Sequence, residues 1–509
     1  MRRCDRTTVT STLHHKFYKS LIIMDNLARA ATPQPAPALH HARRRSLLWR
    51  IHAWAALIAS PFALVAALSG MLYAFTPQLE AMLHGHLDKV VPMGAARPLD
   101  ASVQLARHAA PEGWALHSVL PPLRAEDSVK VAFIPAARNM RNEHAGHGAT
   151  PASPAFLRPS FGVPVSALVV YVNPYPESPE AAGTLHHSAV LGSLMQSKRF
   201  SNWARKLHST YLVDGWRWVI ELAASWLLVM LISGVFLWWP QRQELSQDNA
   251  PAAGRARWQR WHAWTGVTLS LMSAVILVTG LTWSKHAGEQ IRWARDALGQ
   301  QSPRIPGQLR SSPALDAKPM LGWQAAWDAA RAIQPQSTTQ VAMQLIPPRA
   351  EDGPGGFWRA NHLERSPGET GAPTRRFDLL LDAYSGQALY FSGWEAQTAF
   401  GKATAIGIPF HRGEFGLWNQ ALLLLFGLGV VFSILSGWVM YFKRRQRGMA
   451  GLPVLLPQAW RSVSPWAWGG TALLLLALPL LALSSLVVLA IEALLWQRRR
   501  QVATAGPGQ

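Results

Sequence analysis

Long stretches of apolar residues are the feature that most restricts the fold of this 509-residue chain. A helix rises about 1.5 Å per residue, so roughly 20 apolar residues cross the hydrocarbon core of a bilayer. Five segments reach that length: Leu47–Phe75, Val219–Trp239, Trp261–Trp283, Trp418–Phe442 and Trp466–Trp496. The chain is 49% hydrophobic and only 15% charged, which is apolar for a soluble enzyme. The sequence therefore predicts a membrane-embedded bundle of helices.

Positive charge gathers in the short segments that flank these stretches, within a formal net charge of +21. Arg43–Arg45 precede the first stretch, four arginines lie between residues 242 and 260, and Lys443–Arg447 follow the fourth. Basic residues in short flanks mark the cytoplasmic side of a membrane protein. We therefore expect the N-terminus and the short loops to be cytoplasmic, the two long connections to face the other side, and no nucleic acid to be a partner.

The expected fold class is a membrane α-helical bundle of four core spanning helices, arranged as two repeats, with a C-terminal hydrophobic helix and two extracytoplasmic α+β domains. Helical spacing followed by alternating, strand-like segments in both long connections supports the α+β assignment. The predicted segments are 1–45 (cytoplasmic leader, disordered), 46–76 (spanning helix 1), 77–207 (domain 1), 208–240 (spanning helix 2), 241–258 (cytoplasmic loop), 259–285 (spanning helix 3), 286–410 (domain 2), 411–442 (spanning helix 4), 443–464 (cytoplasmic loop), 465–497 (C-terminal spanning helix) and 498–509 (tail).

Two points of this organisation stay open in the sequence. The true start is either Met1 or Met24, which opens a more ordinary cytoplasmic leader. The last apolar stretch is long for one span and short for a hairpin, and Pro479 could kink it. A single span there would place Arg498–Arg500 on the outer side, against the charge rule.

Histidines recur at equivalent places at the ends of four apolar segments. In the first and third, a His-Ala-Trp triplet is followed by a glycine 18 positions after the histidine, namely His52 with Gly70 and His262 with Gly280. In the second and fourth the spacing is 26 positions, for His208 with Gly234 and His411 with Gly437. Each glycine follows a serine or threonine. The duplication predicts four ligands for two haems, with His52 paired to His262 and His208 to His411.

The 18-residue spacing has a geometric meaning. Eighteen residues make five whole helical turns and about 27 Å, so Gly70 and Gly280 lie on the same helix face as their histidines, near the far membrane edge. A small residue there lets a flat porphyrin approach closely, so we expect Gly70 and Gly280 to contribute to the outer haem site.

Other readings of these residues are open. An interfacial histidine can simply occupy the headgroup region, and His84, His86, His286, His186 and His187 are alternative ligands. Glu221 lies within a span, where a carboxylate suggests a proton or propionate role unless it pairs with Arg217. Arg412 could neutralise a haem propionate or lie on the surface.

The number of cysteines limits which cofactors the chain can hold. Cys4 is the only cysteine, so the chain has no Cys-x-x-Cys-His motif, no Cys-ligated iron–sulfur cluster and no internal disulfide. No Gly-x-Gly-x-x-Gly motif follows a strand, which argues against a flavin or nicotinamide domain, and there is no P-loop. We therefore expect haem b, two per chain, with electrons supplied by a membrane quinol or a cytoplasmic reductase.

The histidine motifs carry a family resemblance. They read Arg50-Ile-His52-Ala-Trp54, Lys206-Leu-His208, Arg260-Trp-His262-Ala-Trp264 and Pro409-Phe-His411-Arg-Gly413, and Asp382-Ala-Tyr-Ser-Gly386 resembles the turn of a PepSY domain. The matching turn at Asn173-Pro-Tyr lacks the glycine. Over residues 45–445 the chain resembles the PepSY-associated transmembrane helix family, which includes ferric-siderophore reductases of the ferrioxamine-reductase type.

The resemblance implies an inner-membrane protein with PepSY-like domains in the periplasm. Combined with the histidine pairs, it predicts a dihaem b-type reductase that passes electrons to a ferric siderophore and releases Fe(II). The alternative is a PepSY-domain binding or regulatory membrane protein without redox activity. Repeated units also occur in transporters, but the spans lack the Pro/Gly-broken midplane helices of that class.

Overall fold

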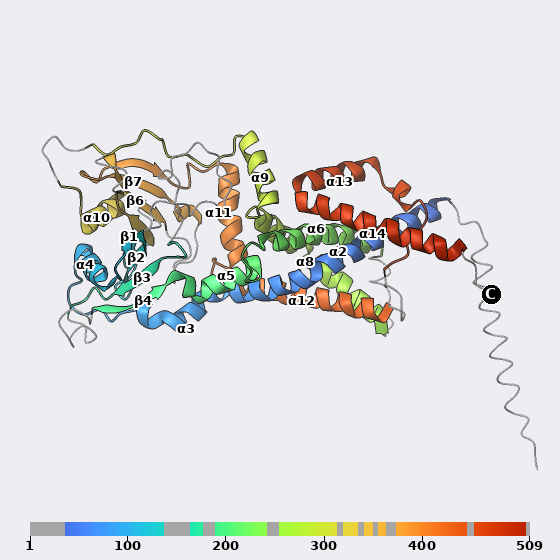
Figure 1. Ribbon diagram of the computed structural model, residues 1–509, viewed down its shortest axis with the longest axis horizontal. Helices are drawn as coiled ribbons and strands as arrows, with labels where there is room; N and C mark the ends of the chain where they lie inside the picture. Colours follow the sequence, from blue (N-terminus) through green and yellow to red (C-terminus); the bar gives the residue numbers. More distant parts are fainter. Residues whose placement is uncertain are drawn as a thin grey trace, which may run out of the picture.

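The computed structural model describes residues 36–136, 163–176, 189–241, 254–312, 319–333, 341–349, 355–362, 373–444 and 452–504. Within these residues, five helices are long and apolar enough to cross a membrane. They are α2 (Ala36–Ala74), α6 (Arg217–Trp238), α8 (Gly254–Leu281), α12 (Leu417–Arg444) and α14 (Pro479–Thr504). The chain is thus a multi-pass helical membrane protein with a strand domain at one end (Figure 1).

Four of the long helices form a ring. Helix α2 packs against α6, α6 against α8, α8 against α12, and α12 against α2. This order places α2 diagonally across the bundle from α8, so side chains that point inward from these two helices meet near the bundle axis. Arg43–Arg45, Arg255–Arg260 and Lys443–Arg444 lie at one end, which we call the basic side. The opposite end, beside the strands, is the sheet side (Figure 1).

Two short helices precede spanning helices, and they correct the predicted bounds 208–240 and 411–442. His208 lies on α5 (Phe200–Thr210), and His411 lies on α11 (Ala399–Arg412). Left-handed backbone at Tyr211 (φ 52°) and Leu212 (φ 65°) separates α5 from α6. Gly413 (φ 77°) and Gly416 (φ 88°) separate α11 from α12. Both breaks lie before the apolar stretches Val219–Trp239 and Trp418–Phe442, and the predicted bounds miss them because they begin each spanning helix at its histidine.

The two long connections share a single antiparallel sheet. The sequence predicts one domain in each connection, whereas the structure joins four strands from each in the order β4-β3-β2-β1-β5-β6-β7-β8. The strands are β1 (Trp114–Leu120), β2 (Val129–Pro135), β3 (Leu168–Val172), β4 (Val190–Met195), β5 (Met343–Ile346), β6 (Phe357–His362), β7 (Asp378–Asp382) and β8 (Ala388–Ser392). The halves meet where Val119 pairs with Leu345, which closes two strand edges that would otherwise be open.

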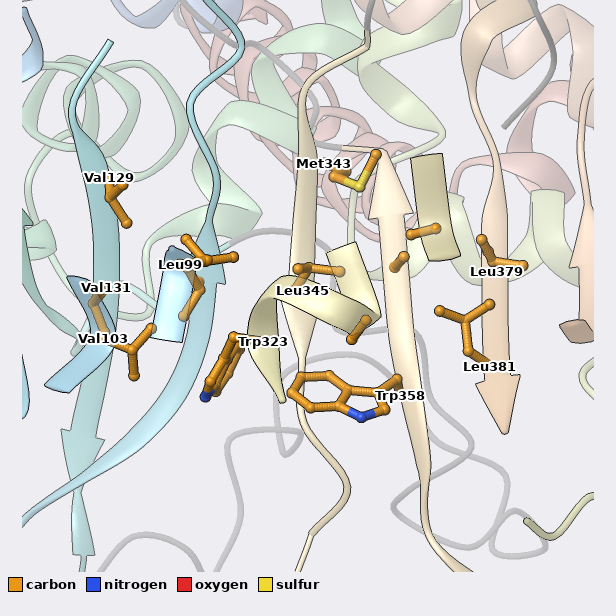
Figure 2. Packing of buried hydrophobic residues seen from close by; sticks show 14 of the residues in the cluster. Leu99, Val103, Val129, Val131, Trp323, Met343, Leu345, Trp358, Leu379 and Leu381 are labelled. Carbon is orange, nitrogen blue, oxygen red and sulfur yellow. The ribbon is translucent and has the colours of Figure 1, made fainter. Parts of the chain in front are cut away.

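Helices α4 (Leu99–Ala109) and α10 (Trp323–Ile333) cover one face of this sheet. Their buried side chains and those of the strands form one core across both halves, in which Trp323 packs edge-to-face on Trp358 with ring centroids 4.8 Å apart (Figure 2). Asp100 on α4 accepts hydrogen bonds from the backbone N–H groups of Trp323 (2.8 Å) and Gln324 (2.9 Å) at the start of α10. The Gln324 side chain in turn accepts the N–H of Leu99 at 2.9 Å.

Two further short helices, α3 (Thr76–Asp88) and α9 (His286–Ala297), follow α2 and α8 at the sheet side. When the 3-10 helices are set aside, the described elements of residues 36–241 recur in the same order in residues 254–444, with a long helix, two short helices, four strands, a short helix and a long helix.

The C-terminal stretch forms a helical hairpin, which corrects the predicted single helix 465–497. Helix α13 (Pro465–Ala477) ends at Leu478, and α14 returns from Pro479 toward the basic side (Figure 1). Proline lacks the N–H that would continue α13, so the chain turns there. Glu492 in the middle of α14 contacts Arg50 in the first half of α2. Arg498 consequently lies with the other basic residues, and the conflict with the charge rule disappears.

Candidate functional site

Four histidines from four helices form two pairs inside the bundle. His52 on α2 and His262 on α8 have ring centroids 6.4 Å apart and interplanar angle 86°. His208 on α5 and His411 on α11 have centroids 6.4 Å apart and interplanar angle 75°. We call these the basic-side pair and the sheet-side pair. The structure thus brings together the two pairs expected from the duplicated spacing, although two of the rings come from short helices.

The neighbouring helix holds each ring of the basic-side pair by its Nδ1 atom. His52 Nδ1 lies 3.1 Å from the backbone oxygen of Met230 and 3.1 Å from Ser233 Oγ, both on α6. His262 Nδ1 lies 3.0 Å from the backbone oxygen of Ser433 and 3.0 Å from Ser436 Oγ on α12. In each case the carbonyl belongs to the residue three positions before the serine.

The sheet-side pair repeats this arrangement. His208 Nδ1 lies 3.0 Å from the backbone oxygen of Ala66 and 3.3 Å from Ser69 Oγ on α2. His411 Nδ1 lies 2.9 Å from Thr279 Oγ1 on α8 and bonds the backbone oxygen of Ile276. In all four cases, the imidazole Nδ1 therefore contacts a hydroxyl of the neighbouring helix and the backbone oxygen of the residue three positions before it.

These contacts determine which nitrogen carries the proton. A backbone oxygen can only accept, so each Nδ1 donates its hydrogen. The hydroxyls also act as acceptors, because they donate to their own helices, as Ser233 Oγ does to Val229 (2.7 Å) and Ser69 Oγ does to Val65 (2.7 Å). Nε2 then keeps its lone pair, and no described residue bonds to Nε2 in any of the four rings. An imidazole fixed in this way is prepared to bind a metal through Nε2.

The distance between the rings fits one metal between them. A histidine nitrogen binds a first-row metal at about 2 Å, and an imidazole centroid lies about 1.1 Å behind that nitrogen, so two imidazoles on opposite sides of one metal have centroids about 6.3 Å apart. Both pairs have 6.4 Å. Among the described residues, no group of three or more His, Cys, Asp or Glu could hold a metal. Two histidines alone at each pair would leave the remaining ligand positions of a metal to another group.

One glycine lies against the Cε1 atom of each imidazole. A Cβ at Gly234 would be 3.2 Å from Cε1 of His52, and one at Gly437 would be 3.6 Å from that of His262. The corresponding distances at the sheet side are 3.2 Å for Gly70 with His208 and 3.5 Å for Gly280 with His411. Gly70 and Gly280 lie at the sheet-side pair, as their spacing suggests. Each of these glycines faces a histidine ring in the structure, whereas the sequence suggested a contact with a porphyrin.

Six residues that contact the four histidines are not among the site residues predicted from the sequence. They are Gly234, Gly437 and the hydroxyl residues Ser69, Ser233, Thr279 and Ser436. The sequence does contain a signal for them, because every one belongs to a Ser-Gly or Thr-Gly dipeptide of the repeat. The sequence could not show that each dipeptide contacts the histidine of a neighbouring helix.

Several of the other residues that the sequence suggested for the site have partners outside the two histidine pairs. His84 Nε2 lies 3.9 Å from Glu80, and the backbone N–H of His286 donates to the Glu221 carboxylate at 3.1 Å. Glu221 also accepts the N–H of Ala287 at 2.6 Å, so this buried carboxylate caps the start of α9. Arg412 forms an ion pair with Glu414 at 2.8 Å. His186 and His187 lie outside the described residues.

A buried charge cluster anchors α5, the helix that carries His208. Arg199, at its start, lies 3.3 Å from Glu80 and 3.4 Å from Asp88 on α3 and contacts the Tyr171 hydroxyl on β3. Lys130 on β2 lies 2.7 Å from Asp88. Burial acts to raise the pKa of Asp88, but the charges of Lys130 and Arg199 outweigh it and hold that pKa below its ordinary value. The cluster therefore fixes the sheet-side pair relative to the sheet.

Comparison with known proteins agrees with this architecture. A search of curated proteins found no match. A family model, described as the PepSY-associated TM region, matches residues 49–444. This range contains both histidine pairs, all four Ser/Thr-Gly dipeptides and the shared sheet, and leaves out the C-terminal hairpin. The chain therefore belongs to the PepSY-associated TM region family.

Proposed function

We propose that this protein is an inner-membrane dihaem b-type reductase that carries electrons across the membrane to a periplasmic ferric siderophore and thereby releases Fe(II). The observation that carries the proposal is the pair of His–His sites, each with centroids 6.4 Å apart and with both Nδ1 atoms bonded to the bundle. A purely structural histidine gains nothing from an Nε2 lone pair that no described residue uses.

The residues fit a b-type haem at each pair. His52 with His262, and His208 with His411, would hold the haem iron, and the single Cys4 allows no thioether attachment of the c-type kind. Held by two histidines, the cofactor would supply one-electron transfer in preference to oxygen binding. The chain's own part is to orient four imidazoles and to keep the sites inside the bundle.

The positions of the pairs suit transfer across a bilayer. His52 and Gly70 both lie on the continuous helix α2, and Gly70 contacts His208. Eighteen residues separate them in sequence, so the two sites are about 27 Å apart along the helix, close to the thickness of about 30 Å of the hydrocarbon core.

The charge distribution supports the proposed direction. The basic residues at the ends of α2, α8, α12 and α14 favour a cytoplasmic basic side and a periplasmic sheet. Electrons would enter at His52 and His262, from a quinol or a cytoplasmic reductase, and leave at His208 and His411. Each Fe(III) takes up one electron and becomes Fe(II), which hard oxygen donors of a siderophore hold less tightly.

The first test is the visible spectrum and haem content of the purified protein. We expect a Soret band, sharp α-bands on reduction and about two haem b per chain by pyridine haemochrome assay, because there are two bis-histidine sites. A colourless protein would overturn the proposal and favour a binding or regulatory membrane protein.

Ligand variants assign each site. His262→Ala should remove the basic-side haem and block electron entry. His411→Ala should remove the sheet-side haem, while the other is still reduced and electron delivery to a ferric chelate stops. His84→Ala, outside both pairs, is the matched control and should keep both haems. Full haem content in both ligand variants would refute the assignment.

A further inference from the structure

Glu492 joins the C-terminal hairpin to the helix that carries His52. Its carboxylate accepts two hydrogen bonds from the Arg50 guanidinium, at 2.7 and 2.9 Å, in a bidentate pair. The indole N–H of Trp54 also donates to Glu492. Arg50 and Trp54 stand two residues before and two residues after His52, so one carboxylate of α14 holds α2 on both sides of the proposed ligand.

The geometry of a helix explains what this contact can do. Arg50 and Trp54 are four residues apart and share one face of α2, whereas His52 is about 200° from Arg50 around the helix axis. Helix α14 thus holds the face opposite to the histidine. This contact sets the rotation of α2, and with it the direction in which His52 points toward His262.

The segment before the hairpin also contacts this part of α2. Arg50 also donates to the backbone oxygen of Pro453 at 2.6 Å, and the N–H of Leu456 donates to Ser46 Oγ at 3.2 Å. The Arg50 side chain is only 4% exposed. A guanidinium buried this deeply needs a compensating charge, and Glu492 supplies it. All of these contacts to α2 come from residues beyond 444, outside the range matched by the family model.

We infer that the C-terminal hairpin completes the basic-side site, with Glu492 as a positioning residue that orients His52 through α2 and balances the charge of Arg50, so that it sets the reduction potential of the cofactor held there. The inference rests on the proposed function. Reduction adds one electron, so a nearby positive charge favours the reduced form and an uncompensated negative charge favours the oxidised form.

The test is a spectroelectrochemical titration of the haem-loaded protein with Glu492→Gln, Arg50→Gln and the double variant. Glu492→Gln leaves the Arg50 charge unbalanced and should shift the basic-side midpoint potential positive. Arg50→Gln leaves the carboxylate unbalanced and should shift it negative. The double variant should return close to the wild-type value. The sheet-side midpoint should not move in any of them.

A control variant separates this effect from general loosening of the hairpin. Ser484, eight residues before Glu492 on α14, accepts the indole N–H of Trp226 on α6 at 3.0 Å. Ser484→Ala removes a hairpin contact without changing charge and should leave both potentials in place. Equal shifts in Ser484→Ala and Glu492→Gln, or shifts of the same sign in Arg50→Gln and Glu492→Gln, would overturn the inference.

Failure of the inference differs from failure of the proposed function. If the wild-type protein binds two haems but Glu492→Gln leaves both potentials unchanged, the hairpin does not act on the site and the reductase proposal stands. If no haem binds, the proposed function fails. The contact between Arg50 and Glu492 can be tested even then. Thermal unfolding of the wild type, the two single variants and the double variant should show that the two residues are coupled.

Discussion

At the scale of single residues, the site depends on how each imidazole is held. Every histidine of the two pairs bonds a backbone carbonyl and a hydroxyl of a neighbouring helix, and a glycine leaves room for its Cε1 edge. The four glycines are not equivalent. The space is tight at Gly70 and Gly234, where an added Cβ would be 3.2 Å from the ring, and ordinary at Gly280 and Gly437, at 3.5 and 3.6 Å.

This difference predicts graded effects of the same substitution. Gly234→Ala should displace the His52 ring and weaken cofactor binding at the basic-side pair about 10-fold or more, the range expected when the support of a metal ligand is lost. Gly437→Ala, across the same pair, should bind almost normally. Haem content and redox titration of both variants measure this. Equal losses would show that the glycines serve helix packing alone.

At the scale of elements, short helices deliver His208 and His411, and the backbone breaks behind them decide where those rings lie. Helix α11 ends at Gly413, whose φ of 77° is left-handed. A Cβ there would also lie 3.2–3.3 Å from Gln420, Ala74 and Leu423. At the equivalent break after α5, the left-handed residues are Tyr211 and Leu212, which carry side chains, followed by Gly215 at φ 87°.

Gly413→Ala should therefore destabilise the protein by about 1–2 kcal/mol, the cost of a left-handed residue with a side chain, and should lower occupancy of the sheet-side pair. Leu212→Gly, with φ 65° in the native chain, is the matched control and should be neutral or stabilising by about 1 kcal/mol. Thermal unfolding in detergent tests both. A stable Gly413→Ala variant with full haem content would contradict the role of this break.

At the scale of the whole molecule, the buried cluster of Glu80, Asp88, Lys130 and Arg199 connects the sheet to the bundle. The pKa of Asp88 lies below its ordinary value of 3.8 in the folded protein, because the two cations outweigh the effect of burial. An unfolded chain would bind the proton at the ordinary pKa. The charged carboxylate thus contributes stability above that value, which is lost as pH falls through the lower, folded-state pKa.

We therefore expect the domain at the sheet side to lose stability as pH falls below about 4, with the loss reduced in Asp88→Asn, which has no carboxyl to protonate. Asp88→Asn should itself be less stable than wild type at neutral pH, because Lys130 and Arg199 lose their partner. Acid unfolding followed by tryptophan fluorescence measures this. An identical acid profile in both proteins would refute the assignment to Asp88.

The sequence by itself determined the membrane bundle, the basic side and the identity of the four histidines. Apolar length, flanking charge and repeated spacing are local properties of the chain, so they can be read without knowing which helices touch. The same holds for the depth of Gly70 and Gly280, which follows from counting turns of a straight helix. The resemblance carried by the histidine motifs also agrees with the family model over residues 49–444.

Only the tertiary structure decided how these parts meet. The breaks before α6 and α12 place His208 and His411 on separate short helices, which the histidine spacing alone does not reveal, and the joining of β1 to β5 is a long-range pairing without a local signal. The partners Ser233 and Gly234 serve His52 because α2 packs against α6, and Glu492 reaches Arg50 because the chain turns at Pro479. Periodicity fixes the face of one helix, whereas contacts between helices depend on the packing of all of them together.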